Sequence, residues 1–240
     1  MADGAAGEEI VATDLLINEP KKNRHDPIMP LGGADWEHVY EPAEDTFLFM
    51  DALEADLPFI QEMKPTVVLE LGTGSGTISA FLASLYPGPC FIATDRNPTA
   101  ATAAQRTFAA NEAPVDVVVA DLFSGIRVRG GIDILLFNPP YVPTPPDEIN
   151  SSAIAMSWAG GDKGREVVDR VFADLDKHLS PKGCMYVVAL DSNDPKEIAA
   201  WMGTKGFRTK VVKKRTAGIE RLLILRIWRD APQPETAPEP

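Results

Sequence analysis

Hydrophobic residues along this chain gather in short continuous runs rather than in an alternating pattern. The clearest runs, rich in Val, Ile and Leu, occupy residues 66–71, 90–95, 115–121, 132–138 and 184–190. A strand that is buried on both faces lacks polar alternation, and helices between such strands cover the two faces of a parallel sheet. The pattern therefore predicts a single α/β domain of the doubly wound kind.

The segments between these runs carry helix signals. We expect helices at 43–57, 76–86, 97–113 and 164–178. The helix at 97–113 has the clearest start, because Asn97 suits the N-cap and Pro98 suits the first helical position. The end of the chain differs, since two apolar runs at 206–214 and 220–228 follow each other closely. They predict an antiparallel pair that closes the sheet.

The two ends of the chain lack such patterns. Residues 1–35 show no sustained periodicity, and the tail is rich in proline and acid. We therefore expect a partly mobile extension at 1–35, a folded domain at 36–229 and a disordered tail at 230–240. The first residues lack the basic and apolar regions of a secretory signal. No run approaches the roughly 18–20 apolar residues that cross a membrane, so we expect no membrane segment.

Charge and cysteine usage narrow the class of protein. The net charge is −12, and it stays negative without the acids of the two ends. Such a surface disfavours strong nonspecific binding of nucleic acid, which needs Lys and Arg contacts to phosphate. Cys90 and Cys184 lack Cys-x-x-Cys spacing, so we expect two buried core thiols, no disulfide framework and no metal site. A reducing intracellular compartment fits this usage.

A glycine-rich loop follows the first predicted strand. Gly72, Gly74 and Gly76 stand between that strand and the next helix, where small residues let the backbone approach a ligand near the helix N-terminus. A dinucleotide site requires a small residue at position 77, which is Thr, and the Gly-Lys-Ser/Thr of a P-loop is absent. The loop therefore predicts a site for a nucleotide-like cofactor that is neither a dinucleotide site nor a P-loop. The alternative is a tight turn that binds no ligand.

Acidic residues mark the carboxyl ends of the first three predicted strands. Glu70 could meet a cationic part of a ligand, and Asp95 is placed to accept hydrogen bonds from a ribose diol. Asp121 is followed by the apolar Leu122 and Phe123, a combination that suits the exocyclic amine and the ring of adenine. Ligands of open α/β sheets gather at these strand ends. One such acid alone would be a common helix cap, but three in succession predict a nucleoside ligand.

The fourth predicted strand ends in Asn138-Pro139-Pro140-Tyr141. The two prolines fix φ and remove two backbone donors, and Pro139 pushes Asn138 toward an extended conformation. By itself this corner could be a plain turn at a strand exit. Together with the glycine loop and the acids, it resembles the S-adenosylmethionine-dependent methyltransferases with a Rossmann-like seven-stranded sheet. The resemblance implies the strand order 3-2-1-4-5-7-6, with the last strand antiparallel.

The resemblance also implies how the cofactor, S-adenosylmethionine, is held and that S-adenosylhomocysteine is the product. The residues that it assigns come from the ends of the first four strands: Glu70, Gly72, Gly74 and Gly76 at the methionine moiety, Asp95 at the ribose, Asp121 and Leu122 at the adenine, and Asn138 beside them.

The Asn-Pro-Pro-Tyr corner suits a planar nitrogen as methyl acceptor. The Asn138 side-chain oxygen and the Pro139 carbonyl can accept its two N–H bonds, and the prolines Pro139 and Pro140 hold these acceptors in place. Tyr141 can pack on the flat π system of the substrate. No histidine lies in these motifs, so we expect none to act as a catalytic base.

Two further stretches narrow the resemblance. Residues 39–53 and 157–170 resemble the eukaryotic and archaeal branch of the HemK family, and the similarity extends over about 36–228. That branch methylates the glutamine of the Gly-Gly-Gln motif in the class-1 peptide-chain release factor. The match implies that Thr46 lies near the cofactor and that 158–164 forms part of the substrate-side rim, although packing explains Trp158 equally well.

The resemblance also implies a partner. Bacterial HemK members carry an N-terminal helical bundle, for which the residues before Trp36 are too few, whereas the eukaryotic branch works with a small zinc-binding activator subunit. In the implied sheet order, residues 115–120 form an edge strand with Asp116 as its one charge. Uncovered apolar edges pair with other chains. We expect the activator to add a strand there in a heterodimer, unless the N-terminal segment covers the edge.

The predicted activity is therefore that of a protein-glutamine N5-methyltransferase in the cytoplasm, with the nucleus as an alternative location. An amino methyltransferase that acts on DNA adenine N6 or on a protein lysine stays open, although the acidic surface and the lack of a target-recognition domain disfavour DNA. A cofactor-binding scaffold without turnover is disfavoured by the intact Asn-Pro-Pro-Tyr.

Overall fold

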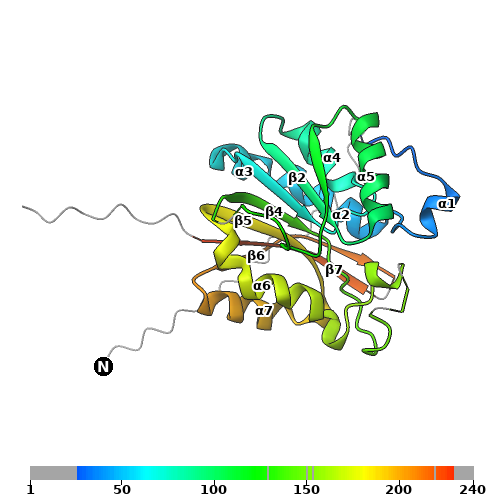
Figure 1. The fold of residues 1–240 in the computed structure, drawn as a ribbon. Helices are drawn as coiled ribbons and strands as arrows, with labels where there is room; N and C mark the ends of the chain where they lie inside the picture. The colour runs from blue at the N-terminus through cyan, green and yellow to red at the C-terminus, as the bar shows by residue number, and fades with distance from the viewer. Residues whose placement is uncertain (1–25, 129, 150, 153, 219, 230–240) are drawn as a thin grey trace, which may run out of the picture.

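The computed structural model describes residues 26–128, 130–149, 151–152, 154–218 and 220–229, so the expectations for 1–25 and 230–240 lie outside the described residues. Its centre is a seven-stranded sheet in the order β3-β2-β1-β4-β5-β7-β6 (Figure 1). The strands are β1 (Val67–Leu71), β2 (Cys90–Asp95), β3 (Val115–Val119), β4 (Ile132–Phe137), β5 (Leu179–Leu190), β6 (Arg208–Ala217) and β7 (Glu220–Trp228). The predicted fold class and strand order are confirmed.

The continuous apolar runs become the central strands. Every residue of β4 is buried, and β4 pairs in parallel with both β1 and β5. β7 runs antiparallel to β5 and β6, which confirms the predicted closing pair. Because β1, β2, β3 and β4 are mutually parallel, the loops after these strands converge at one edge of the sheet.

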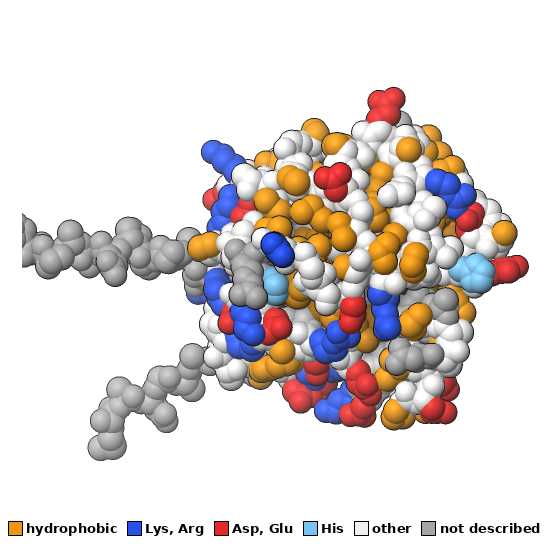
Figure 2. All heavy atoms as spheres, viewed as in Figure 1, with side chains coloured by type: hydrophobic (Ala, Val, Ile, Leu, Met, Phe, Trp, Pro, Cys, Tyr) orange, Lys and Arg blue, Asp and Glu red, His pale blue; other side chains and the backbone are white. Residues whose placement is uncertain are grey.

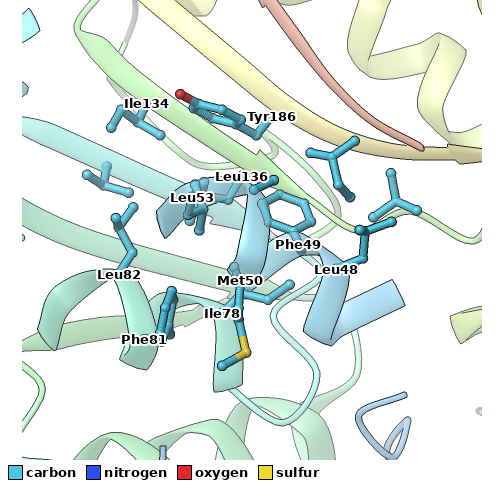
Figure 3. Close-up of a cluster of buried hydrophobic side chains, with 14 of the residues drawn as sticks. Leu48, Phe49, Met50, Leu53, Ile78, Phe81, Leu82, Ile134, Leu136 and Tyr186 are labelled. Atoms are coloured by element: carbon cyan, nitrogen blue, oxygen red, sulfur yellow. The ribbon is translucent and has the colours of Figure 1, made fainter. Parts of the chain in front are cut away.

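Helices cover both faces of the sheet. On one face, α2 (Glu44–Ala55), α3 (Leu57–Met63) and α4 (Thr77–Leu85) contribute to one hydrophobic cluster. Figure 3 shows Phe49 of α2 lying beside Leu136 of the sheet, and Phe81 of α4 belongs to the same cluster. α5 (Pro98–Ala110) packs beside α4, and α6 (Glu166–His178) and α7 (Pro195–Thr204) cover the other face. None of the described helices is both long and apolar enough to cross a membrane.

The predicted helices are present, and Asn97 caps α5 by accepting from the Thr99 N–H at 2.9 Å. The sequence pattern gave no indication of α1 (Gly33–Trp36), α3 or α7. The helix expected at 43–57 ends at Ala55, and a separate helix, α3, begins at Leu57 with a proline in its first turn. β5 begins earlier than the predicted 184–190, because Leu179 is buried and pairs with Ile132.

Cys90 contradicts the expectation of two buried thiols. Cys184 is buried in the middle of β5, whereas Cys90 is exposed. Cys90 is the first residue of β2, directly after the Pro87-Gly88-Pro89 turn, and so it lies at the amino edge of the sheet outside the helical layers. Burial raises the pKa of the Cys184 thiol. Both residues have apolar neighbours in the sequence, but only Cys184 belongs to the hydrophobic cluster that α2, α3 and α4 form with the sheet.

The described residues before α2 lie against α5. The Ile28 N–H donates to the Asn111 side-chain oxygen at 2.8 Å, and the Asn111 amide donates back to the Ile28 carbonyl at 2.7 Å. Further along, the carbonyl of His38 accepts from the Asn97 side chain at 2.8 Å. This attachment brings Val39 and Tyr40 to the carboxyl edge of the sheet.

Candidate active site at the carboxyl ends of the strands

An open cavity lies at the carboxyl ends of β1, β2 and β4. Its walls are the loops after these strands, the start of α2 and residues 38–40. Most residues expected around the cofactor and the methyl group reach it, namely Thr46, Glu70, Gly72, Gly74, Asp95, Asp121, Leu122, Asn138 and Pro140. The parallel sheet therefore brings together side chains that are far apart in the sequence.

The glycine loop forms one wall of the cavity. Gly72 and Gly74 have φ values of 62° and 54°, in the left-handed region that residues with a Cβ rarely adopt. Gly76, with φ of 81°, faces α5 rather than the cavity, because a Cβ built there would stand 3.0 Å from the Ala104 Cα. Two of the three glycines thus let backbone approach a ligand, and the third lets α4 begin close to α5.

Asp95 ends β2 and is held by two backbone groups. The Gly74 N–H donates to its Oδ2 at 2.9 Å, and the Asn97 N–H donates to its Oδ1 at 2.8 Å. Burial raises the pKa of this carboxyl against the effect of the two hydrogen bonds. Each carboxylate oxygen can accept a further bond. The geometry therefore suits the two hydroxyl groups of a ribose.

Glu70 lies near the end of β1 and is 1% exposed. The Thr73 hydroxyl donates to its Oε2 at 2.7 Å, and the Ser79 hydroxyl donates to the same oxygen. Desolvation outweighs these bonds, so burial raises the pKa of Glu70 to about 7. A ligand cation nearby would favour the charged form, and this wall of the cavity therefore suits an ammonium group.

Asp121 and Leu122 form the far end of the cavity. Leu122 adopts φ of 51° and packs against the hydrophobic cluster on the α6 side of the sheet. The Asp121 carboxylate pairs with Arg170 of α6, at 2.7 Å between Oδ2 and Nη2. Both partners are largely exposed, so the pair is weak and open to solvent. An apolar side chain beside an acceptor is the combination expected for an adenine.

The Asn138 side chain lies at the exit of β4 with its two ends in different surroundings. Its Nδ2 donates to the Asp45 Oδ2 at 2.9 Å. Its Oδ1 is buried and has no hydrogen-bond partner among the residues that the structure describes. A buried acceptor without a partner is costly unless a ligand completes it. Asn138 therefore presents an acceptor, and not a donor, to the cavity.

The rest of the corner is tied to neighbouring loops. Pro139 and Tyr141 line a small second cavity together with Gly164 and Asn193. The Tyr141 hydroxyl donates to the Asp45 Oδ2 at 3.1 Å. Burial, followed by the nearby Asp45 charge, raises the pKa of Tyr141, so its phenol stays protonated and remains a donor.

Residues 158–164 pack against the chain that leaves this corner. The Val142 N–H donates to the Trp158 carbonyl at 3.0 Å, and the Gly160 N–H donates to the Val142 carbonyl at 2.8 Å. Gly164 has φ of 69°, and a Cβ there would lie 1.9 Å from the Tyr141 carbonyl oxygen. Only glycine therefore fits at position 164, and the two loops form one unit beside the cavity.

Sequence reasoning missed Asp45. This residue, in the first turn of α2, is 3% exposed and contacts four side chains of the site region. The signal that could have identified it is an acid on the face of α2 that is otherwise mostly apolar and buried. His38 and Arg170 also line the cavity without having been predicted. Among the described residues, no three His, Cys, Asp or Glu side chains are grouped to hold a metal ion.

The cavity fits S-adenosylmethionine by the chemistry of its walls. A buried carboxyl suits the ammonium group, a backbone-held aspartate suits the ribose, and an apolar residue beside an acid suits the adenine. A family model described as the methyltransferase small domain matches residues 46–154. The fold and the cavity thus define an S-adenosylmethionine-dependent methyltransferase.

Comparisons with known proteins place the chain within this class. It is 45% identical over 82% of its length to methyltransferase HEMK2 of Mus musculus, covering 92% of that protein. It is 40% identical over 81% of its length to the eRF1 methyltransferase catalytic subunit mtq2 of Schizosaccharomyces pombe, covering 91% of it. The chain belongs to the HemK family of protein N5-glutamine methyltransferases.

A solved structure agrees with this assignment. The Mtq2 chain of the E. cuniculi Mtq2–Trm112 complex, described as responsible for methylation of the eRF1 translation termination factor, superposes with a TM-score of 0.62. The two chains are 30% identical, and the match covers 80% of this chain and 99% of the other. The fold and the sequence therefore point to the same branch.

Proposed function

We propose that this enzyme methylates the side-chain amide nitrogen, N5, of the glutamine in the Gly-Gly-Gln motif of a peptide-chain release factor. The observation that carries the proposal is the buried Asn138 Oδ1, an acceptor without a partner in the described part of the chain, on a residue that lines the cofactor cavity. A glutamine amide has two N–H groups that can complete such an acceptor. The names of the S. pombe and E. cuniculi relatives, which act on eRF1, support the same substrate.

The chain's main task in this reaction is positioning. The bound cofactor would supply a methyl group that is already electrophilic: the bond from nitrogen to this carbon would form as the carbon–sulfur bond breaks, and S-adenosylhomocysteine would leave. The methylated, positively charged nitrogen would then release a proton to solvent, which requires no strong base. An amide nitrogen is a weak nucleophile because its lone pair is delocalised. Acceptance of its two N–H bonds by the Asn138 Oδ1 and the Pro139 carbonyl would hold the nitrogen in line and favour lone-pair density toward the methyl group. Pro140 and Tyr141 would stiffen and flank this corner.

The cofactor-site roles follow the cavity walls. Glu70 with Gly72 and Gly74 would hold the methionine moiety, Asp95 the ribose, and Asp121 with Leu122 the adenine. Thr46, at the start of α2, also lines the cavity. Gly76 would act indirectly by letting α4 pack on α5.

We further propose that the enzyme works in the cytoplasm as a heterodimer with a small zinc-binding activator of the Trm112 kind. The E. cuniculi relative was solved as a complex with Trm112. In this chain β3 is an edge strand, and its Val118 and Val119 are 41% and 56% exposed. Figure 2 shows hydrophobic side chains gathered in the middle of the face viewed in Figure 1, with charged side chains mainly around them. The partner would add a strand to β3.

Transfer of a labelled methyl group tests the substrate. The heterodimer is incubated with a release factor that has its Gly-Gly-Gln intact or with its glutamine replaced, and separately with adenine-containing DNA and a lysine peptide. Label is expected on the intact release factor alone. The Asn138→Ala variant should still bind the cofactor, but its rate of methyl transfer should fall roughly 10²–10³-fold. Label on the glutamine-free factor, on DNA or on lysine at a comparable rate would contradict the proposal.

A further inference from the structure

The Asp45 carboxylate is the meeting point of the groups around Asn138. Its Oδ2 accepts from the Asn138 Nδ2 at 2.9 Å and from the Tyr141 hydroxyl at 3.1 Å. Its Oδ1 accepts from the Thr46 N–H at 2.7 Å and from the Tyr40 hydroxyl at 3.2 Å. The side chain is buried in the first turn of α2, where the helix N-terminus favours a negative charge. Both oxygens are therefore occupied by donors.

This arrangement decides which end of the Asn138 amide faces the cavity. A carboxylate accepts hydrogen bonds and donates none, so the end of Asn138 that contacts Asp45 has to be the NH₂ group. The opposite end, Oδ1, is the buried acceptor for which the described residues offer no partner. If the amide turned over, two oxygens would face each other at Asp45, and an NH₂ group would face the N–H bonds of the substrate.

We propose that Asp45 is the positioning residue that fixes the Asn138 amide with its oxygen toward the reacting nitrogen. The inference rests on the proposed function and names a group on which that function depends. Through its second contact, the same carboxylate also holds the Tyr141 ring beside the corner. Asp45 touches neither the substrate nor the cofactor in this role, and acts through Asn138 and Tyr141.

The first test is Asp45→Asn in the heterodimer, a change that keeps the shape and removes the charge. The backbone N–H of Thr46 cannot turn away, so the oxygen of the new side chain stays on that side and its NH₂ faces Asn138. The Asn138 amide then turns over. We expect kcat on the release factor to fall roughly 10²–10³-fold, with cofactor affinity by calorimetry within about threefold of the wild type. A rate above about a tenth of the wild type would overturn the proposal.

A matched control lies on the same helix. Asp51 is a partly buried acid of α2 that pairs with Arg215 of β6 and does not line the cavity. Asp51→Asn removes a charge from the same helix, nearer to its middle. We expect its kcat to stay within about twofold of the wild type. A loss equal to that of Asp45→Asn would mean that the charge of α2, and not the contact to Asn138, matters.

The decisive experiment exchanges the two side chains. In the double variant Asp45→Asn with Asn138→Asp, the NH₂ group at position 45 donates to one oxygen of the carboxylate at position 138. The other oxygen stays an acceptor toward the cavity. Asn138→Asp alone places two carboxylates in contact and should be as slow as Asp45→Asn. The double variant should be at least about tenfold faster than either single variant, and a rate no better than theirs would contradict the proposal, since a merely structural role predicts additive losses.

A readout without substrate separates this inference from the proposed function. The side-chain NH₂ signals of Asn138, identified by NMR through their loss in Asn138→Asp, should report the contact to Asp45. We expect both proton signals to shift in Asp45→Asn and to stay in place in Asp51→Asn. Unchanged signals in Asp45→Asn would refute the role of Asp45 even if the release factor is methylated. Absence of methylation by the wild type, with the expected shifts, would refute the substrate and leave the role of Asp45 supported.

Discussion

At the scale of single residues, the site is built from buried polar groups whose partners are incomplete. Glu70 accepts hydrogen bonds from two hydroxyls, yet burial still raises its pKa. Asn138 keeps an acceptor that no described residue satisfies. Groups of this kind cost stability in the free protein, because buried polar atoms without full compensation are unfavourable. A ligand that supplies the missing charge or donor recovers that cost when it binds.

Glu70 leads to a prediction about pH. Its pKa in the fold is about 7, above the usual glutamate value of 4.5, so the folded state holds a proton that the unfolded state has released. This group therefore weakens the fold as pH rises from about 4.5 to 7. An ammonium ligand needs the charged form, so cofactor affinity should rise more than about tenfold between about pH 5.5 and 7.5. Calorimetry across this range measures it.

The control for this prediction is Glu70→Gln, which cannot titrate. Its cofactor affinity should be lower and nearly independent of pH over the same range. If the variant keeps the slope of the wild type, the proton belongs to another group, and Glu70 does not meet the ammonium group.

At the scale of elements, the site depends on two loops that are joined by one buried side chain. Asn193 follows β5 and is 2% exposed. Its Nδ2 donates to the carbonyls of Tyr141 and Lys163, each at 2.8 Å, and its Oδ1 accepts from the Leu190 N–H at 2.6 Å. The strand exit, the 158–164 loop and the end of β5 are thereby fixed to one another. The position of the Asn-Pro-Pro-Tyr corner is thus set from behind the cavity as well as from α2.

Asn193→Ala tests this connection. The change leaves three backbone groups without this partner, among them the buried Leu190 N–H, so the free energy of unfolding should fall by about 1–3 kcal/mol. Methyl transfer should also slow, because the corner loses its support. Chemical denaturation measures the free energy of unfolding. The control is Thr204→Ala, which removes an exposed hydroxyl on α7, and its free energy of unfolding should stay within about 0.5 kcal/mol of the wild type. Equal stability of the two variants would show that the loops are held by other contacts.

At the scale of the whole molecule, the two edges of the sheet differ in chemistry. β6 carries Lys210, Lys213 and Lys214 along its length, and such charges prevent pairing with another chain. β3 ends in exposed valines and carries one charge, Asp116. Val117 is partly buried against the cluster that contains Phe108, so a lysine there would disturb the fold itself. Val119 is more exposed, so its replacement can test binding of the partner without disturbing the fold.

Val119→Lys should therefore prevent the heterodimer without unfolding the chain. A lysine at this exposed edge position blocks an added strand, while the stability of the free chain should change by less than about 0.5 kcal/mol. Co-expression with the activator, followed by size-exclusion chromatography, should give a 1:1 complex for the wild type and none for the variant. Thr216→Lys on β6, at the opposite edge, should still form the complex. A stable complex with Val119→Lys would place the partner elsewhere.

The sequence by itself determined the architecture and the place of the chemistry. Apolar runs identify buried strands because burial on both faces demands apolar side chains at every position, so the core strands and the closing pair could be predicted with small errors at their ends. The glycine loop, Asp95 and Asn138 could be placed at the same edge because parallel strands direct their carboxyl ends to one side. Short helices such as α3 and α7 were not predicted, because a helix of a few turns shows little hydrophobic periodicity.

The tertiary structure decided how the side chains are used. Cys90 and Cys184 have similar neighbours in sequence, yet one is exposed and one is buried, because burial depends on which helix covers a strand end. Gly76 belongs to the same motif as Gly72 but faces α5. The orientation of the Asn138 amide is set by Asp45, which lies 93 positions earlier. A hydrogen bond between distant residues exists only once packing has brought them together, and no local pattern records it.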